Sequence, residues 1–370
     1  MPRVIGIDPG TVSIDLCGLD DGRMFLDRSF PTAEALADPA TIVALLRNAG
    51  PLDLIAGPSG YGLSLTPAAQ VTDDDLLLAF LAAEGESGGI GGLRALARAL
   101  ARSGLPVVFT PGVIHLPSVP AHRKVNRVDM GTADKVCATA LAIDEQARRT
   151  GRPVDSVSLV LLELGGAFTA AVAVERGQIV DGFGGTSGPL GFRAAGALDG
   201  EVAYLAGTIS KAMLFGGGAA TVAGWEDETA SAPPERFAQP ATPREQIAWD
   251  AFVESAAKAA TALATSVPSR TEFVLSGRLA RVEAVQHAIG ERLGPVGPTR
   301  LLGGFAAVAK EGAQGAALLA DGLAGGTHRA LVERLGIRAA RGTTLDHLYF
   351  ITPARARERL GGGGGRGVRV

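Results

Sequence analysis

The chain has 370 residues, of which 46% are hydrophobic, 20% charged and 5% aromatic. This composition supplies a sizeable core and excludes a wholly disordered chain, and the length predicts two domains because single cores stop growing at about 250–300 residues. Lys and Arg number 35 against 38 Asp and Glu, which gives a net charge of −3. No overall positive field is available to hold a nucleic-acid backbone, so we expect no nucleic-acid partner.

The cysteines and the apolar stretches bear on location. Cys17 and Cys137 match neither a disulfide framework nor a pair of metal ligands, which favours a reducing cytoplasm. Residues 1–10 lack the basic and apolar regions of a secretory signal. Residues 202–225 are weakly charged but carry Lys211 and three adjacent glycines, so we expect an interface or buried segment rather than a membrane span. A cytoplasmic protein without a membrane partner is predicted, and this segment favours a homodimer.

The first half of the chain is expected to form strands and helices in the following order from the N-terminus. Residues 4–30 predict a strand, a turn with Asp8 and Gly10, a second strand, a tight turn at Asp21-Gly22 and a third strand. The elements expected after them are a helix over 33–48, a strand over 52–60, helices over 73–83 and 93–102, a strand over 106–110 and a helix over 131–149.

The segment 157–183 has the same layout as the start of the chain, which indicates an internal duplication. An offset of 155 residues without a gap aligns three landmarks: Asp8 with Glu163, Gly10 with Gly165, and Gly22 with Gly177. Later elements also correspond: a strand over 272–277, a helix over 279–293, a strand over 299–304 and a helix over 306–323. We therefore predict an α/β fold of two domains, each a mixed five-stranded sheet with packed helices, facing each other across a cleft.

Domain boundaries follow from this repeat. We expect a first lobe over 1–150, a second lobe over 151–325 and an extension over 326–370 that ends in a disordered glycine-rich tail. The second lobe carries an insert, 183–270, in which 226–245 reads as an acidic surface loop. A helix is predicted to start at Thr242, because Pro243 fits the first helical position and Glu245 completes a capping box.

Each half places a glycine turn at the end of its leading strand. In the first glycine turn, residues 8–11, the Asp8 carboxylate could hold magnesium while Gly10 lets backbone N–H groups approach a phosphate. The second glycine turn, residues 163–167, offers Glu163 in the same position. One such turn alone is more often only a turn, but equivalent places in a duplicated unit favour a polyphosphate bound with metal between them.

Three motifs resemble those of the actin-like ATPase superfamily, which includes acetate and sugar kinases, actin and heat-shock chaperones. GIDPGT at 6–11 and LELGGA at 162–167 are similar to its two phosphate motifs, and FVLSGRLAR at 273–281 to its adenosine motif. The resemblance implies a duplicated ribonuclease H-like fold around a nucleotide cleft that binds ATP or ADP with Mg²⁺, held at Asp8 and Glu163. The nucleotide-binding residues that it implies are Gly10, Thr11, Ser13, Glu163, Gly165, Gly166, Ala167, Ser276, Gly277 and Arg278.

Segments 126–135, 184–201 and 313–326 further resemble a family of predicted butyrate kinases. This resemblance implies a kinase that transfers phosphate from Mg-ATP to a small carboxylate of the butyrate or acetate type, forming an acyl phosphate. A carboxylate acceptor is already ionised at neutral pH and needs no general base. Two other readings stay open: a sugar or polyol kinase, and an ATP-driven switch or activator ATPase, including a nucleotide-binding scaffold without turnover.

The polar segment 122–129 precedes the last helix of the first half, near the predicted cleft. His122 and Arg127 could bind the substrate carboxylate or the transferring phosphoryl group, and Asp129 or Asp134 could contact metal or act as a base. A solvated loop with a helix cap at Asp129 explains the same pattern. Arg193 lies among small and apolar residues, so it either binds an anion or emerges on the surface.

Overall fold

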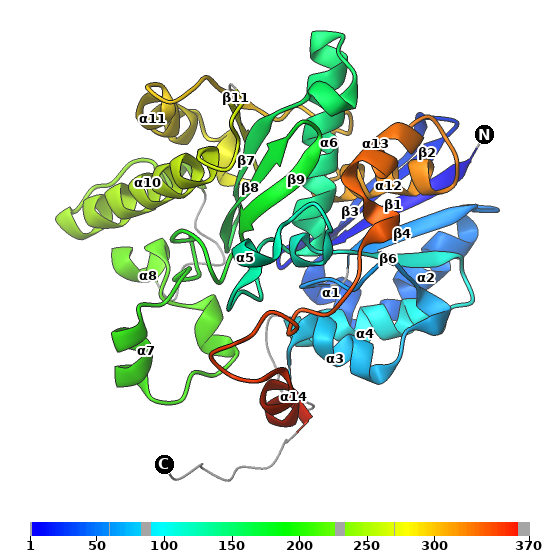
Figure 1. The fold of residues 1–370 in the computed structure, drawn as a ribbon, viewed down its shortest axis with the longest axis horizontal. Helices are drawn as coiled ribbons and strands as arrows, with labels where there is room; N and C mark the ends of the chain where they lie inside the picture. Colours follow the sequence, from blue (N-terminus) through cyan, green and yellow to red (C-terminus); the bar gives the residue numbers. More distant parts are fainter. Residues whose placement is uncertain (1, 59, 83–89, 226–233, 270, 362–370) are drawn as a thin grey trace.

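The computed structural model describes residues 2–58, 60–82, 90–225, 234–269 and 271–361. Two mixed sheets organise the fold, as the predicted duplication requires (Figure 1). The first sheet has the order β3-β2-β1-β4-β6-β5, from β1 (Arg3–Pro9), β2 (Ser13–Asp20), β3 (Arg23–Pro31), β4 (Leu54–Pro58), β5 (Thr66–Pro67) and β6 (Val107–Thr110). The second has the order β11-β10-β7-β8-β9, from β7 (Leu159–Leu164), β8 (Thr169–Glu175), β9 (Gln178–Phe183), β10 (Glu272–Ser276) and β11 (Thr299–Leu301).

The duplication is confirmed down to irregularities of the backbone. Both hairpins have a left-handed pair at the turn, Asp21-Gly22 and Arg176-Gly177, with φ of 52° and 72° in one and 51° and 74° in the other. The register also shifts between Gly18 and Leu19 in β2 and between Ala173 and Val174 in β8. Bulges and primed turns depend on particular local geometry. Their recurrence at the same offset supports two copies of one unit.

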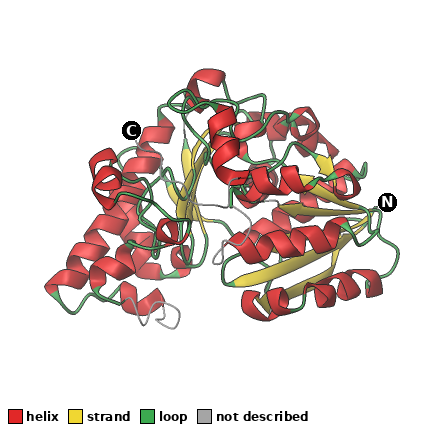
Figure 2. Cartoon of the chain, turned by 90° about the horizontal axis from the view of Figure 1, so that it is seen from below, coloured by secondary structure: helices red, strands yellow, loops and turns green. Residues whose placement is uncertain are grey.

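Helices cover both sheets and also separate them. Those on the first sheet are α1 (Thr32–Ala37), α2 (Pro39–Asn48), α3 (Asp73–Phe80) and α4 (Ile90–Ala101). Those on the far face of the second are α8 (Ala219–Ala223), α10 (Pro243–Ala264) and α11 (Glu283–Leu293). Between the sheets lie α6 (Ala133–Thr150) and α12 (Glu311–Leu323). In Figure 2 the strands of the two sheets form separate groups, with helices around each.

The middle layer joins the halves. Helix α12 belongs to the second half by chain order, yet it packs against β1, β2 and β4 of the first sheet and against α6. Gly315 permits the crossing, because a Cβ there would lie 1.8 Å from the carbonyl oxygen of Cys137 on α6. Cys17 on β2 and Cys137 are both free and fully buried in this layer. The predicted domain boundary near residue 150 stays a prediction. Helix α12 follows that boundary in the chain but packs on the sheet that precedes it.

Several details differ from the sequence prediction. The strand expected over 299–304 ends at Leu301, and the helix expected over 306–323 begins only at Glu311. The first sheet has six strands rather than five, because Thr66-Pro67 returns antiparallel along β6; proline tolerates such an edge position. The helix expected over 33–48 is two helices, since Asp38 ends one and caps the next, with Pro39 at its first position. In the expected surface loop, residues 234–237 form helix α9 (Pro234–Phe237), and Phe237 is buried against Phe192 and Phe252.

Helix α10 begins as predicted, with the capping box of Thr242 and Glu245. The helices not yet described are short: α5 (Ala121–Lys124), α7 (Gly200–Ala206), α13 (Arg329–Leu335) and α14 (Pro353–Gly361). The tail expected to be disordered lies outside the described residues, beyond residue 361.

The segment on which the homodimer was predicted includes part of α7, where Tyr204 and Leu205 are 77% and 80% exposed. The homodimer stays a prediction. Among the described helices, none combines the length and apolar character needed to cross a bilayer.

Candidate functional site

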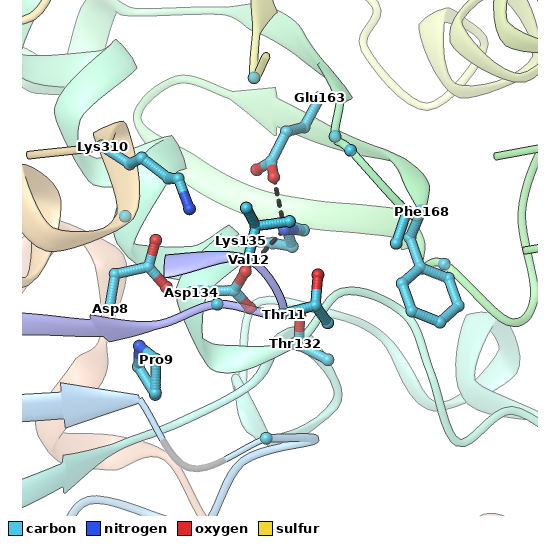
Figure 3. A pocket seen from close by; sticks show the side chains of 18 of the residues that line it. Asp8, Pro9, Thr11, Val12, Thr132, Asp134, Lys135, Glu163, Phe168 and Lys310 are labelled. Atoms are coloured by element: carbon cyan, nitrogen blue, oxygen red, sulfur yellow. Dashed lines mark hydrogen bonds and ion pairs between the residues drawn. The ribbon is translucent and has the colours of Figure 1, made fainter. Parts of the chain in front are cut away.

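A cavity of about 210 Å³ opens where the two glycine turns face each other, between the halves of the duplication (Figure 3). The N-terminal ends of α6 and α12 also reach it, so two glycine turns and two helix N-termini converge on one space. Its lining is Asp8, Pro9, Gly10, Thr11, Val12, Gly60, Tyr61, Leu93, Asp129, Thr132, Asp134, Lys135, Glu163, Gly165, Gly166, Ala167, Phe168, Gly185, Thr186, Phe215, Gly277, Arg278, Lys310, Glu311 and Gly312.

The two glycine turns share a geometry. The Gly10 N–H donates to the carbonyl of Ser13 at 3.0 Å, and the Gly165 N–H donates to the carbonyl of Phe168, again at 3.0 Å. The Lys310 ammonium lies beside the first turn, only 3.2 Å from where a Gly10 Cβ would be. Each turn is therefore closed by a backbone hydrogen bond, and the Lys310 ammonium lies beside the first turn.

The adenosine motif packs on the second glycine turn. Gly277 has a φ of +89°, and a Cβ there would lie 2.6 Å from the carbonyl oxygen of Leu164. Only glycine fits a left-handed conformation at such close approach. Gly277 and the exposed Arg278 line the cavity, whereas Ser276 is buried behind it. The motif thus forms one wall with the second turn, at the place that the resemblance implies.

A buried ion cluster lies at the start of α6. The Lys135 ammonium is 2.6 Å from Asp134 Oδ2 and 2.5 Å from Glu163 Oε1, so it links the first half to the second glycine turn. Thr132 donates a hydrogen bond to Asp134. At the start of α12, Glu311 pairs with Arg281 at 2.5 Å and Lys310 with Asp15 at 3.3 Å.

Burial and neighbouring charge shift the pKa values of the carboxyls. Burial, with the adjacent Asp134, raises the pKa of Asp8 to about 8. Burial raises the pKa of Asp129 and, against the attraction of Lys135, that of Glu163. Burial also acts on Asp134, but the Lys135 ammonium and its hydrogen bond bring the pKa of Asp134 below its usual range.

The insert closes one side of the cavity. Asp129 accepts hydrogen bonds from the backbone N–H and hydroxyl of Thr186, each at 2.9 Å, and from the Gly131 N–H at 3.2 Å. It therefore anchors the insert rather than capping α6, whose N-cap is Thr132. The rings of Phe168 and Phe215 meet edge to face at 5.0 Å, giving this side an apolar surface.

Most predicted site residues meet at the cavity. The predicted residues that line it are Asp8, Gly10, Thr11, Asp129, Asp134, Glu163, Gly165, Gly166, Ala167, Gly277 and Arg278. Five do not line it: Ser13, His122, Arg127, Arg193 and Ser276. Their functional roles, like those of the lining residues, stay predictions.

The five residues off the lining have other surroundings. His122 is exposed on α5, and Arg127 donates to the carbonyl of Ser187. Arg193 is half-buried and donates to the carbonyl of Gly166, so it braces the second glycine turn from behind. Ser13 donates to Asp15 at 2.7 Å.

Several lining residues were not predicted from the sequence, among them Lys135, Lys310, Glu311 and Phe215. Lys310 and Glu311 could have been found, because they start the last helix of the second half, as Asp134 and Lys135 start that of the first. Phe215 gave no signal, since only the tertiary path of the insert brings it beside Phe168.

Solved structures resemble this chain in fold. A propionate kinase from Francisella tularensis subsp. tularensis SCHU S4 has a TM-score of 0.60 at 11% identity, covering 86% of this chain and 98% of that one. An acetate kinase from Porphyromonas gingivalis has 0.58 at 12%, covering 85% and 98%. An acetate kinase from Entamoeba histolytica has 0.56 at 11%, covering 79% and 86%. No curated protein matches the sequence.

The two equivalent sheets, with glycine turns facing across a cavity, define an α/β protein of the actin-like ATPase fold. Within that fold, the chain belongs to the family described as protein of unknown function (DUF1464), which it matches over residues 6–350.

Proposed function

We propose that this chain is an ATP-dependent phosphotransferase whose acceptor is a small carboxylate of the acetate or butyrate type. The observation that carries the proposal is the convergence of two equivalent glycine turns and two helix N-termini on one cavity. Helix N-termini and turn N–H groups favour anions, so four such elements suit a polyphosphate. The likeness to acetate and propionate kinases supports the fold that this proposal needs.

The nucleotide would lie along the second half. Gly277 lets the backbone come close to the adenosine, with Arg278 beside it, and the phosphates would extend between the glycine turns. Lys310 would also belong to the nucleotide site, because its ammonium lies beside the first glycine turn and would neutralise phosphate charge.

The residues fit a magnesium ion. The Asp8 carboxylate is buried, and within the described residues no hydrogen bond reaches it. Five carboxylates line the cavity, Asp8, Asp129, Asp134, Glu163 and Glu311, against three cations, Lys135, Lys310 and Arg278. No cluster of three His, Cys, Asp or Glu side chains suited to a metal occurs in the described part of the chain. Mg²⁺ usually takes only one or two carboxylates and completes its shell with phosphate and water, which Asp8 and Glu163 allow.

The acceptor would lie on the apolar side of the cavity, beside Phe215 of the insert. Phe168, Phe215 and Leu93 offer apolar surface for an acyl chain, and the chemistry requires no base there. One carboxylate oxygen of the acceptor attacks the terminal phosphorus, the bond from that phosphorus to the bridging oxygen breaks, and ADP leaves. The protein contributes alignment and neutralisation of charge, which is most of what phosphoryl transfer requires. Magnesium, when bound with the nucleotide, supplies further neutralisation of the phosphate oxygens.

An alcohol acceptor is the second candidate, and Asp129 is the observation in its favour. A hydroxyl must lose a proton during transfer, and a buried carboxylate whose pKa is raised is suited to accept one. Against it, both oxygens of Asp129 already accept hydrogen bonds from Thr186 and Gly131.

The test is trapping of acyl phosphate with hydroxylamine. Purified protein is incubated with Mg-ATP and straight-chain acids of two to six carbons, and in parallel with glycerol and glucose while ADP release is followed. We expect hydroxamate from at least one acid, and none from the Asp8→Asn variant or without ATP. ADP release with an alcohol and no hydroxamate would move the function to the second candidate. ADP release that no acceptor alters would favour a switch ATPase.

A further inference from the structure

Lys135 occupies an unfavourable place for a cation. It lies in the first turn of α6, where the helix dipole presents positive charge to a lysine. Its side chain is only 15% exposed. A buried ammonium at a helix N-terminus requires strong compensation, which Asp134 and Glu163 supply at 2.6 and 2.5 Å.

The two carboxylates hold this ammonium where the halves of the protein meet. Asp134 is close enough to Asp8 for their charges to interact, and Glu163 begins the second glycine turn. Figure 3 shows Lys135 between Glu163 and Asp134. Lys310, by contrast, has a side chain that is 40% exposed. Lys135 is thus the more deeply buried of the two cavity lysines.

The hydrogen bonding of Lys135 is incomplete. An ammonium has three N–H donors, and two of them are used by Asp134 and Glu163. Among the residues that the structure describes, no acceptor takes the third. Since the side chain lines the cavity, an anionic oxygen bound there could complete the set.

We propose that Lys135 is a phosphate-binding residue, with its ammonium held between Asp134 and Glu163 to contact the terminal phosphate of the bound nucleotide. This inference rests on the proposed function and adds a residue to it. Because the ammonium would attract the negative charge of the terminal phosphate, its contribution to binding depends on the number of phosphates in the nucleotide. A lysine that merely neutralises Asp134 and Glu163 would make no contact with ATP, so bound ATP would leave its reactivity toward an amine label unchanged.

The experiment compares affinities for AMP, ADP and ATP, each with Mg²⁺, by calorimetry on the full chain. The variants are Lys135→Met and, as the matched control, Lys258→Met, which removes an exposed lysine of α10 that pairs with Glu254 at 2.5 Å. We expect Lys135→Met to weaken ATP binding roughly ten- to a hundred-fold, the range of a lost charge-assisted hydrogen bond. AMP binding should change less than about two-fold, and Lys258→Met should match the wild type for all three.

Two outcomes overturn the assignment. If Lys135→Met binds ATP as the wild type does, or weakens AMP and ATP equally, Lys135 does not contact the terminal phosphate. If the wild type itself binds no adenine nucleotide, the proposed function fails, and this inference fails with it.

A second measurement needs no variant, in case Lys135→Met does not fold. The chain has five lysines, so amine labelling followed by mass spectrometry can report each one. We expect Mg-ATP, but not AMP, to slow the labelling of Lys135 relative to Lys258. Equal labelling with and without ATP would contradict the contact.

Discussion

Asp8 is a buried carboxyl with a second acidic side chain close to it. It is 7% exposed, lies near Asp134, and its pKa is raised to about 8. The Cβ of a residue at Gly312 would come within 2.6 Å of its carboxylate, so the start of α12 lies directly against it. A carboxylate kept at such cost, without a protein donor among the described residues, is expected in a site that receives a cation.

We therefore predict that Asp8→Asn abolishes Mg-ATP turnover without unfolding the chain. The amide is neutral without taking up a proton, whereas Asp8 must be protonated to stay uncharged in this buried place, so the melting temperature of the free protein should stay equal or rise. The measurement is thermal unfolding with and without Mg²⁺, beside ADP release. Normal turnover in this variant would exclude Asp8 from the site.

The same substitution has a pH signature. With a folded-state pKa raised to about 8, Asp8 keeps a proton in the folded chain that the unfolded chain has already lost, so its contribution to stability falls as pH rises from about 4 to about 8. The stability advantage of Asp8→Asn over the wild type should grow across that window. Parallel pH profiles for the two proteins would contradict the raised pKa.

At the scale of elements, the loop between β11 and α12 is clamped by side chains from outside it. Asp27 on β3 accepts hydrogen bonds from the N–H groups of residues 307–309 at 2.9, 3.0 and 2.6 Å. Glu145 on α6 accepts from Gly303 and Gly304. This clamp fixes the residues just before Lys310 and Glu311, and so sets where the start of α12 meets the cavity.

We predict that Asp27→Ala costs about 2 kcal/mol of stability, because three backbone donors lose a charged acceptor. Turnover should fall as well, since Lys310 is no longer held over the first glycine turn. Chemical denaturation and ADP release measure the two effects. Asp155→Ala, at an exposed position, serves as the control and should change neither.

At the scale of the whole molecule, α6 and α12 make one core out of two halves. Their buried faces share a cluster with strands of both sheets, so the middle layer belongs to neither half alone. Any movement of the two sheets relative to each other would therefore have to bend around this packed layer.

We expect Gly315→Ala to disrupt this layer. The added Cβ would meet the backbone of Cys137 at 1.8 Å, and two helix backbones cannot move apart without opening the core, so a loss of about 3 kcal/mol or more is expected. Gly200→Ala in α7, where no atom lies within 4 Å of the new Cβ, is the matched control. Equal melting temperatures for both variants would show that the helices can separate cheaply.

The sequence by itself determined the repeat, most of the strands and helices, and the two glycine turns, because these depend on residues close together in the chain. Periodicity, turn residues and capping boxes act within a few positions. The split at Asp38 and the edge strand at Thr66-Pro67 were missed, since short breaks leave weak local signals.

Only the tertiary structure decided which side chains share the cavity. The contact of Lys135 with Glu163 spans 28 positions and that of Asp27 with Ala309 spans 282, and no local pattern encodes such pairs. The placement of α12 on the first sheet is likewise a consequence of packing, because an apolar helix face specifies that it is buried and leaves its partner open. Burial then sets the pKa of Asp8, a property that its sequence neighbours alone do not contain.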